Sequence, residues 1–302
     1  MKYFFTHIFQ VFINDKDIRK FKRNLFYFIF YRAVRKFLNK DIKVKIYNFF
    51  VWCSFRKNKM SHSIIRKCDF EDLKELNLIK ILSEDKPTLI FDCGSNFGFY
   101  SLYLASLNEN NQAIAFEASP KTYQELNKNI EENEFKNIQC HNLALTNNDN
   151  QTLTFFESSN DWESSLIESN FNDKTKTTIS SAKLDSFEDR IEKKNQHIVI
   201  KLDVEGYEMQ VLDGAKKIIE QHYPIIILEF SIFIDKDKKF NYNYLKSFLV
   251  QYDYLIFNTN YQEISLQDVL AEIKNLPKNM FGVGNKFLVK KNSKIEYLIK
   301  NF

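Results

Sequence analysis

Short apolar runs alternate with longer segments of helical periodicity along most of this chain. The apolar runs are bounded by glycine, proline or polar residues, which is typical of buried strands. Strands are predicted over residues 89–92, 112–117, 137–145, 152–156, 175–182, 197–203, 224–230 and 254–257, and residues 286–289 are predicted as a closing antiparallel edge strand.

Between these strands, apolar residues return every three or four positions, which predicts amphipathic helices. Ser119 and Pro120 indicate where one helix begins, because serine is a favoured N-cap and proline is favoured at the first helical position. Helices are predicted over residues 69–84, 99–104, 119–134, 206–221 and 242–250. This alternation predicts an α/β fold with a doubly wound, mostly parallel, Rossmann-like sheet.

The N-terminal region differs from the rest in charge. Residues 1–60 carry 15 Lys or Arg and 3 Asp or Glu, whereas the remaining residues carry 28 and 36. Apolar residues recur at helical spacing over residues 15–38, and an aromatic-rich segment follows over 42–55. One interpretation is contact with an anionic membrane surface or an acidic partner protein; the other is a set of helices that cap the main domain. We therefore divide the chain into a basic, aromatic, helical region (1–85) and a main domain (86–302).

Composition narrows the class of protein. With 44% hydrophobic and 16% aromatic residues, the chain can build a core, which argues against disorder over most of its length. The four cysteines lack metal-ligand spacing, which favours a reduced, cytoplasmic protein. The N-terminus does not resemble a signal peptide, and no apolar run approaches the roughly 20 residues of a membrane span. The predicted location is cytoplasmic, with the basic region as a candidate for peripheral attachment to the inner face of the membrane.

Polar residues lie at or near the ends of five of the predicted strands, those at 89–92, 112–117, 137–145, 197–203 and 224–230. In a parallel sheet these ends share one edge, and ligands bind in the crevice beyond it. The residues at these positions are Asp92, Glu117, Asn142, the pair Asp203 and Glu205, and Glu229.

The first strand leads into a glycine turn of the form D-x-G-x-N-x-G, built from Asp92, Gly94, Asn96 and Gly98. Glu117 follows 19 residues after the last glycine, where a carboxylate can accept hydrogen bonds from both ribose hydroxyls. The spacing is not G-x-G-x-x-G, and an acidic residue at the turn disfavours a diphosphate. The pattern therefore favours an adenosine cofactor with a cationic amino end, such as S-adenosylmethionine, over NAD.

Several segments resemble the FkbM family of S-adenosylmethionine-dependent methyltransferases. They are DCGSNFGFYSL, AFEASP, the triplet Ser164-Ser165-Leu166, AKLDSF and IKLDVEGYEMQVLDGA, and they span roughly residues 87–230. The resemblance implies a class I methyltransferase fold and methyl transfer to a hydroxyl, commonly on a sugar, often in bacterial capsule or lipopolysaccharide biosynthesis. It also implies that Asp92, Gly94, Asn96 and Gly98 line the methionine part of the cofactor, that Glu117 holds the ribose beside Ala118 and Ser119, and that Asn142 and Ala144 lie near the adenine.

Methyl transfer from a sulfonium depends on orientation, and a base within hydrogen-bond reach of the hydroxyl helps. Lys201, Asp203 and Glu205 alternate along one face as their strand ends. Asp203 is the preferred base or orienting carboxylate, with Glu205 second and Glu229 a candidate from the next strand. Lys201 is expected to pair with an acidic neighbour. A divalent metal held by Asp203 and Glu229 is an alternative that the sequence does not predict.

Other function classes fit less well. No N/D-P-P-Y/F segment follows the strand at 197–203, which argues against a nucleic-acid amino methyltransferase, and no nucleic-acid partner is predicted. The glycine spacing argues against a Rossmann oxidoreductase. A non-catalytic binding protein on a methyltransferase fold stays open. The expected partner is a sugar, nucleotide-sugar or glycan acceptor, which the sequence does not identify.

Overall fold

The computed structural model describes residues 41–54, 64, 72–158, 174–191, 195–231, 238–276 and 282–301. The predicted helix over 15–38 and the triplet at 164–166 lie outside these ranges. The described elements, in chain order, are β1 (Ile42–Ile46), β2 (Phe49–Cys53), α5 (Leu73–Asp85), β3 (Thr88–Cys93), α6 (Phe99–Leu107), β4 (Gln112–Phe116), α7 (Pro120–Asn133), β5 (Ile138–His141), β6 (Ala144–Leu145), β7 (Thr152–Ser158), β8 (Lys174–Ala182), the 3-10 helix η1 (Leu184–Arg190), β9 (His197–Leu202), α8 (Glu208–Asp213), α9 (Lys216–His222), β10 (Ile225–Ser231), α10 (Lys238–Tyr252), β11 (Tyr254–Phe257), β12 (Glu263–Ile264), α11 (Leu266–Lys274), β13 (Gly282–Lys290) and α12 (Lys294–Lys300).

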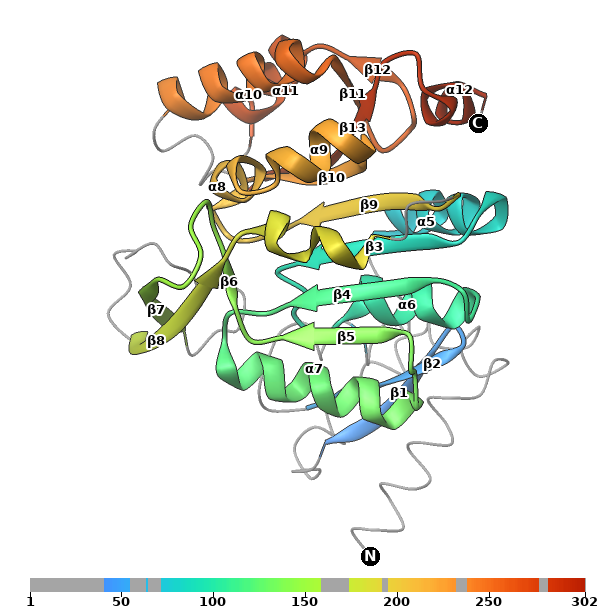
Figure 1. Ribbon diagram of the computed structural model, residues 1–302, viewed down its shortest axis with the longest axis vertical. Coiled ribbons are helices and arrows are strands. Elements are labelled where there is room, and N and C mark those ends of the chain that lie inside the picture. Colours follow the sequence, from blue (N-terminus) through green and yellow to red (C-terminus); the bar gives the residue numbers. More distant parts are fainter. Residues whose placement is uncertain are drawn as a thin grey trace, which may run out of the picture.

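A mixed, mostly parallel sheet forms the centre of the molecule, with helices on both faces (Figure 1). Its eight strands lie in the order β12-β11-β13-β10-β9-β3-β4-β5. The stretch from β10 to β5 is parallel, and its strands are apolar because both of their faces are covered. All six residues of β3 are buried, as are all six of β9. The predicted α/β class and Rossmann-like sheet are confirmed.

Two predicted elements are interrupted where a side chain or a close backbone contact replaces the regular pattern. The strand predicted over 137–145 ends at His141, because Asn142 donates to the carbonyls of Glu117 and Ala118, and Ala144–Leu145 joins β8 in a separate small sheet with β7. The helix predicted over 206–221 is broken at Gly214, where an added Cβ would lie 2.2 Å from the Thr146 carbonyl oxygen.

The C-terminal part of the sheet was predicted less well than the centre. Strand β13 is antiparallel as predicted, but it is not an edge strand, because it pairs with β10 on one side and β11 on the other. Helix α11 was not predicted. Its start at Ser265 forms a capping box with Asp268, a spacing visible in the sequence.

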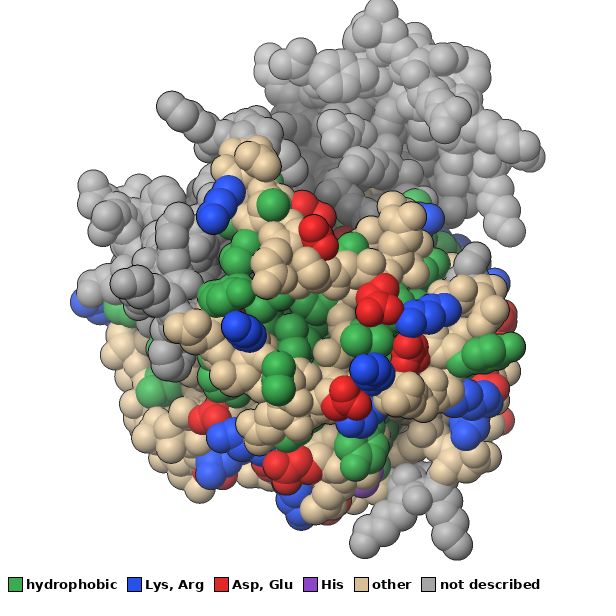
Figure 2. Space-filling model, turned by 90° about the horizontal axis from the view of Figure 1, so that it is seen from above, with side chains coloured by type: hydrophobic (Ala, Val, Ile, Leu, Met, Phe, Trp, Pro, Cys, Tyr) green, Lys and Arg blue, Asp and Glu red, His purple; other side chains and the backbone are tan. Residues whose placement is uncertain are grey.

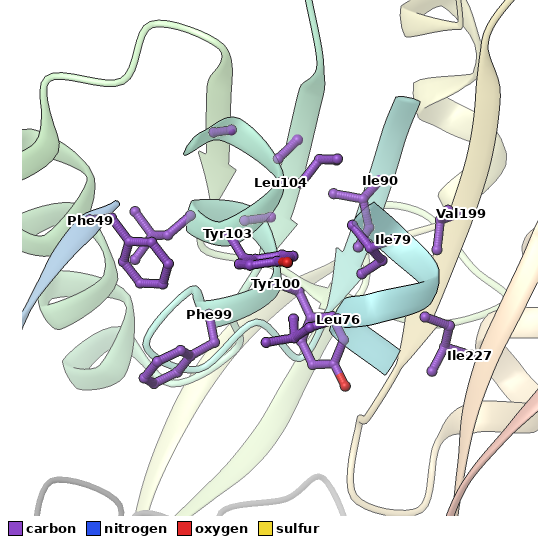
Figure 3. Packing of buried hydrophobic residues seen from close by; sticks show 14 of the residues in the cluster. Phe49, Leu76, Ile79, Ile90, Phe99, Tyr100, Tyr103, Leu104, Val199 and Ile227 are labelled. Carbon is purple, nitrogen blue, oxygen red and sulfur yellow. The ribbon is translucent and has the colours of Figure 1, made fainter. Parts of the chain in front are cut away.

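Residues 42–53 form an antiparallel hairpin of β1 and β2, not the helices expected for the N-terminal region. The reason is a period of two: Ile42, Val44 and Ile46 are buried while the residues between them are more exposed. Phe49 on β2 packs against Phe99 on α6, with ring centroids 6.2 Å apart. Figure 3 shows this hairpin residue in the same cluster as side chains of α5, α6 and the sheet. The division proposed at residue 85 stays a prediction.

Candidate functional site

The carboxyl ends of β3, β4, β5 and β9 point to the same edge of the sheet (Figure 1). Asp92 and Lys201 are register partners on neighbouring strands, so their side chains share one face, the face that α5 and α6 cover. Glu117 follows the end of β4, Asp203 follows the end of β9, and Glu229 lies near the end of β10. The fold therefore brings the predicted strand-end carboxylates to one edge.

In the glycine turn between β3 and α6, several backbone amides donate hydrogen bonds to carbonyls of the protein itself. Gly94, Asn96 and Gly98 have positive φ angles of 79°, 49° and 84°. The amides of Gly94 and Ser95 both donate to the carbonyl of Phe116, at 3.0 and 2.9 Å, and that of Gly98 donates to Ser95. Because these N–H groups are already bonded within the protein, this part of the turn is not arranged as an anion-binding cradle.

Gly94 also explains how the turn meets Asp203. An ideal Cβ at Gly94 would lie 1.9 Å from the Asp203 carbonyl oxygen, so no larger residue fits there without backbone movement. The Asp203 amide donates to the Cys93 carbonyl at 3.1 Å. This contact places the end of β9 directly against the glycine turn.

Glu117 closes the other side of the turn. Its Oε2 accepts from the Asn96 amide and its Oε1 accepts from the Ser119 amide, both at 2.9 Å. The residue is 9% exposed, and burial raises the pKa of its carboxyl to about 7. Asn142 supports this loop through the two carbonyls it binds. The Ser119 hydroxyl accepts from the Thr122 amide, which confirms the predicted cap of α7.

Asp92 and Ala144 are more enclosed than the predicted contact with a cofactor would require. Asp92 is 1% exposed, and its Oδ2 accepts from both the hydroxyl and the amide of Ser101 in α6. Burial raises the pKa of Asp92 to about 6. Ala144 is 3% exposed and packs with Phe155 and Ile179 of the small sheet. In this conformation both residues support the loops around the site.

Lys201, Asp203 and Glu229 form a charge cluster in which Lys201 is buried and the two carboxyl groups are partly exposed. Lys201 is 2% exposed and its Nζ donates to Asp203 Oδ2 at 3.2 Å, which matches the predicted pairing with an acidic neighbour. Asp203 and Glu229 are hydrogen-bonded carboxyls. The charge on Asp203 together with burial raises the pKa of Glu229 to about 10, while Lys201 keeps the pKa of Asp203 below its ordinary value. At neutral pH, Asp203 is the ionised member of the pair and Glu229 holds the proton.

The turn after β9 is held by a residue that the sequence analysis missed. Glu208 Oε1 accepts from the amides of Val204 and Gly206 and so holds this turn. Glu205 adopts a positive φ of 53° in this turn and its side chain is partly exposed. Glu205 thus lies in the loop that follows Asp203, and its role as the second candidate stays a prediction.

The structure adds further polar groups that were not predicted: Asp72 just before α5, Glu75 on α5, Tyr100 and Ser101 on α6, and Asn285 on β13. The sequence gives no signal for these residues, because the period of a helix or strand does not distinguish a buried polar side chain from one at the surface. Among the described residues, no three His, Cys, Asp or Glu side chains are placed to hold a metal ion.

The family model described as "Methyltransferase FkbM domain" matches residues 92–256. A curated relative, Methyltransferase 1 of Beauveria bassiana (strain ARSEF 2860), is 24% identical over 158 residues, and the match covers 46% of this chain and 61% of the relative. The chain thus spans about three fifths of that relative's length.

Solved structures show weaker similarity. Methyltransferase FkbM from Methylobacillus flagellatus KT is 16% identical over 75% of this chain and 52% of its own, with a TM-score of 0.39. M. jannaschii TYW2 in complex with AdoMet is 13% identical over 83% and 85%, with a TM-score of 0.44. TM-scores this low do not establish membership of a family, which rests here on the family model. Because that match covers more than half of the chain, this protein belongs to the FkbM methyltransferase family.

Proposed function

We propose that this protein is an S-adenosylmethionine-dependent O-methyltransferase that acts on a sugar hydroxyl in the biosynthesis of a bacterial surface polysaccharide. The observation that carries the proposal is the ionised Asp203 held against the glycine turn. A carboxylate placed there can accept a proton from a hydroxyl beside a methyl donor. The family match supports the methyltransferase activity, and the sugar acceptor follows from the family resemblance alone.

The residues present fit the proposed cofactor. S-adenosylmethionine supplies an electrophilic methyl group on a positively charged sulfur. The turn offers carboxylates and bonded amides, an arrangement suited to a cation and unsuited to the diphosphate of NAD. Asn96 Oδ1 is buried and has no hydrogen-bond partner within the described residues. Asn96 with Gly94 and Gly98 would hold the methionine part, as the resemblance implies.

The ribose and adenine parts would be held on the β4 and β5 side. Within the described residues each Glu117 oxygen accepts one hydrogen bond, so each has a further lone pair that can accept from a ribose hydroxyl. His141 stacks on Phe116, with ring centroids 5.5 Å apart, and its Nε2 is buried without a partner in the described part of the chain. That nitrogen, beside Asn142, suits the polar edge of a nucleobase.

Asp203 would act as the base. Its carboxylate accepts the hydroxyl proton as the acceptor oxygen becomes bonded to the methyl carbon and the sulfur–carbon bond breaks. Lys201 and the protonated Glu229 each stabilise the ionised form of Asp203 before the reaction. In this proposal Glu229 donates a hydrogen bond to Asp203 and is not itself the base, although the sequence analysis gave it as a further candidate for that role.

A cytoplasmic location remains part of the proposal, with residues 1–60 as the candidate contact with the inner face of the membrane or with an acidic protein. No helix in the described ranges is long and apolar enough to cross a membrane. On the described face seen in Figure 2, acidic and basic side chains are interspersed. The excess of lysine and arginine in residues 1–60 is therefore the basis of this part of the proposal. Liposome flotation with the lysines and arginines of residues 1–40 replaced by glutamine would test this.

Calorimetry tests the cofactor. S-adenosylmethionine should bind with micromolar-scale affinity and NAD should not, because the amides of Gly94, Ser95, Asn96 and Gly98 are already bonded within the protein and are not offered to a diphosphate. Glu117→Ala should weaken binding of the methyl donor by about 1–3 kcal/mol, the range for losing a charged hydrogen-bond acceptor. Preferential binding of NAD would contradict the assignment.

A second variant separates catalysis from binding. Asp203→Asn should lower the rate of methyl transfer by about 100-fold or more, since it removes the base, while changing cofactor affinity far less. The measurement is transfer of labelled methyl from S-adenosylmethionine to a panel of sugar glycosides. Equal losses of turnover and cofactor affinity would instead assign Asp203 to cofactor binding.

A further inference from the structure

Polar side chains continue from Asp203 and Glu229 onto Asn285 of β13, which lies outside the family-matched residues 92–256. We call these side chains, with those of α5 and α6 described below, the polar row. Glu229 and Asn285 are register partners on antiparallel strands, so their side chains lie on the same face. Asn285 is 7% exposed, and its Nδ2 donates to Glu75 Oε1 at 2.9 Å. Its Oδ1 is buried and has no hydrogen-bond partner in the described part of the chain. A buried carbonyl oxygen without a donor is costly unless a donor arrives from elsewhere.

The first turn of α5 and the start of α6 complete this row. The Tyr100 hydroxyl donates to Asp72 Oδ2 at 2.7 Å, and Lys201 Nζ lies 5.4 Å from the centroid of the Tyr100 ring. Asp72 is the residue before α5, and Glu75 lies in its first turn. The α5 groups and Asn285 therefore lie next to the proposed base although neither belongs to residues 92–256.

The charges in this row do not cancel. Five carboxyl groups interact electrostatically with Lys201: Asp72, Glu75, Asp92, Asp203 and Glu229. Lys201 is the one cation that these interactions share among the described residues, and it is already paired with Asp203. The proton on Glu229 removes one negative charge, and the remaining carboxylates still outnumber the single positive charge of Lys201. A ligand with a carboxylate or phosphate close to its reacting hydroxyl would meet this excess in a partly buried site, where charge repulsion is weakly screened.

We infer that Asp72, Glu75, Tyr100, Glu229 and Asn285 form the acceptor subsite, and that it takes a hydroxyl compound that is uncharged or carries an amino group and rejects an anionic ring. Asn285 Oδ1 supplies an acceptor for a ligand O–H or N–H, and the carboxylates favour positive charge. This inference rests on the proposed function, because it assumes that a hydroxyl reaches Asp203. It narrows the acceptor to a sugar unit that has no carboxylate or phosphate on the methylated ring.

The test uses three rings that differ mainly in charge. The full-length protein is loaded with S-adenosylhomocysteine, and binding of methyl glucoside, methyl glucosaminide and methyl glucuronide is measured by saturation-transfer NMR. The glucoside and the glucosaminide should bind, and the glucuronide should bind at least about tenfold more weakly. Asp72→Asn should narrow the difference between the glucosaminide and the glucuronide, and Asn285→Ala should weaken all binding.

Asp253→Asn is the matched control, because Asp253 is an exposed acid just before β11, at the opposite edge of the sheet. It should leave the order of binding unchanged. Equal binding of the three rings, preference for the glucuronide, or binding of none would overturn the inference. If Asn285→Ala does not fold, the comparison of the wild type with Asp72→Asn still decides the question. Failure of S-adenosylmethionine to bind would count against the proposed function, whereas methylation of the glucuronide in preference would count against the acceptor subsite alone.

Discussion

At the scale of single residues, the role of each polar side chain depends on its bonding partners more than on its type. Asp92 and Glu117 both follow apolar strands, yet Asp92 bonds to Ser101 beneath α6, whereas Glu117 bonds to the loops that border the site. Asp203 stays ionised because Lys201 pairs with it, and Glu229 stays protonated because Asp203 is already charged. Residues of one chemical class therefore take different roles at the same edge of the sheet.

The raised pKa of Glu117 predicts a pH-dependent affinity for the ribose. Burial raises this pKa from 4.5 to about 7, and the ionised form accepts from two hydroxyls. Affinity should therefore rise with pH, by about tenfold between about pH 6 and pH 8. Adenosine is the probe, because it has no group that titrates in this range, and calorimetry is the measurement. Glu117→Gln should bind weakly with no such trend, and an affinity that falls as pH rises would contradict the role assigned to Glu117.

At the scale of elements, α7 connects the N-terminal hairpin to the glycine turn. Asn129 accepts from the Trp52 amide at 2.8 Å and donates to the Phe97 carbonyl at 3.1 Å. One turn later, Asn133 accepts from the Phe50 amide and donates to its carbonyl. Two asparagines at helical spacing thus satisfy the free edge of β2, which would otherwise be unpaired.

Asn129→Ala should destabilise the protein by about 2–4 kcal/mol, because it leaves a half-buried donor at Trp52 and a buried acceptor at Phe97 without partners. Urea unfolding measures the loss, and faster hydrogen exchange at the Trp52 amide would locate it. Gln124→Ala on the same helix is the control, since Gln124 is exposed. Equal stability of the two variants would refute the proposed connection.

At the scale of the whole molecule, segments outside the family-matched residues belong to the same core as those within it. The hydrophobic cluster beneath α5 and α6 contains Phe49 from the hairpin, Leu76 from α5 and Ile90 from β3, which Figure 3 labels. It also contains Phe287 from β13. Because these residues share one core, the described parts should unfold together. This sharing also explains why α5 and β13 can contribute groups to the site.

Phe49→Ala should lower the free energy of unfolding by about 3–5 kcal/mol, the range for removing a buried phenylalanine. Circular dichroism and Trp52 fluorescence, measured in a Trp162→Phe background, should report one shared transition. Val250→Ala, at a position 76% exposed, should have little effect. A separate early transition of Trp52 would mean that the hairpin is an independent unit.

Local patterns predicted most of the strands and the cap at Ser119, because the period of burial and the capping chemistry are properties of neighbouring residues. They did not predict the hairpin, although Ile42, Val44 and Ile46 alternate, because the flanking aromatic residues suggested a continuous helical region. The interior position of β13 also escaped prediction, since which strands pair in a sheet depends on contacts between residues far apart in the chain.

The sequence by itself determined the α/β class, the acidic strand ends and the family. Only the tertiary structure decided which of those acids meet, which one keeps its charge, and that Asp72, Glu75 and Asn285 join them. The physical reason is that burial and charge pairing are set by residues brought together from distant strands and helices, whereas periodicity records only how each segment meets its own surroundings.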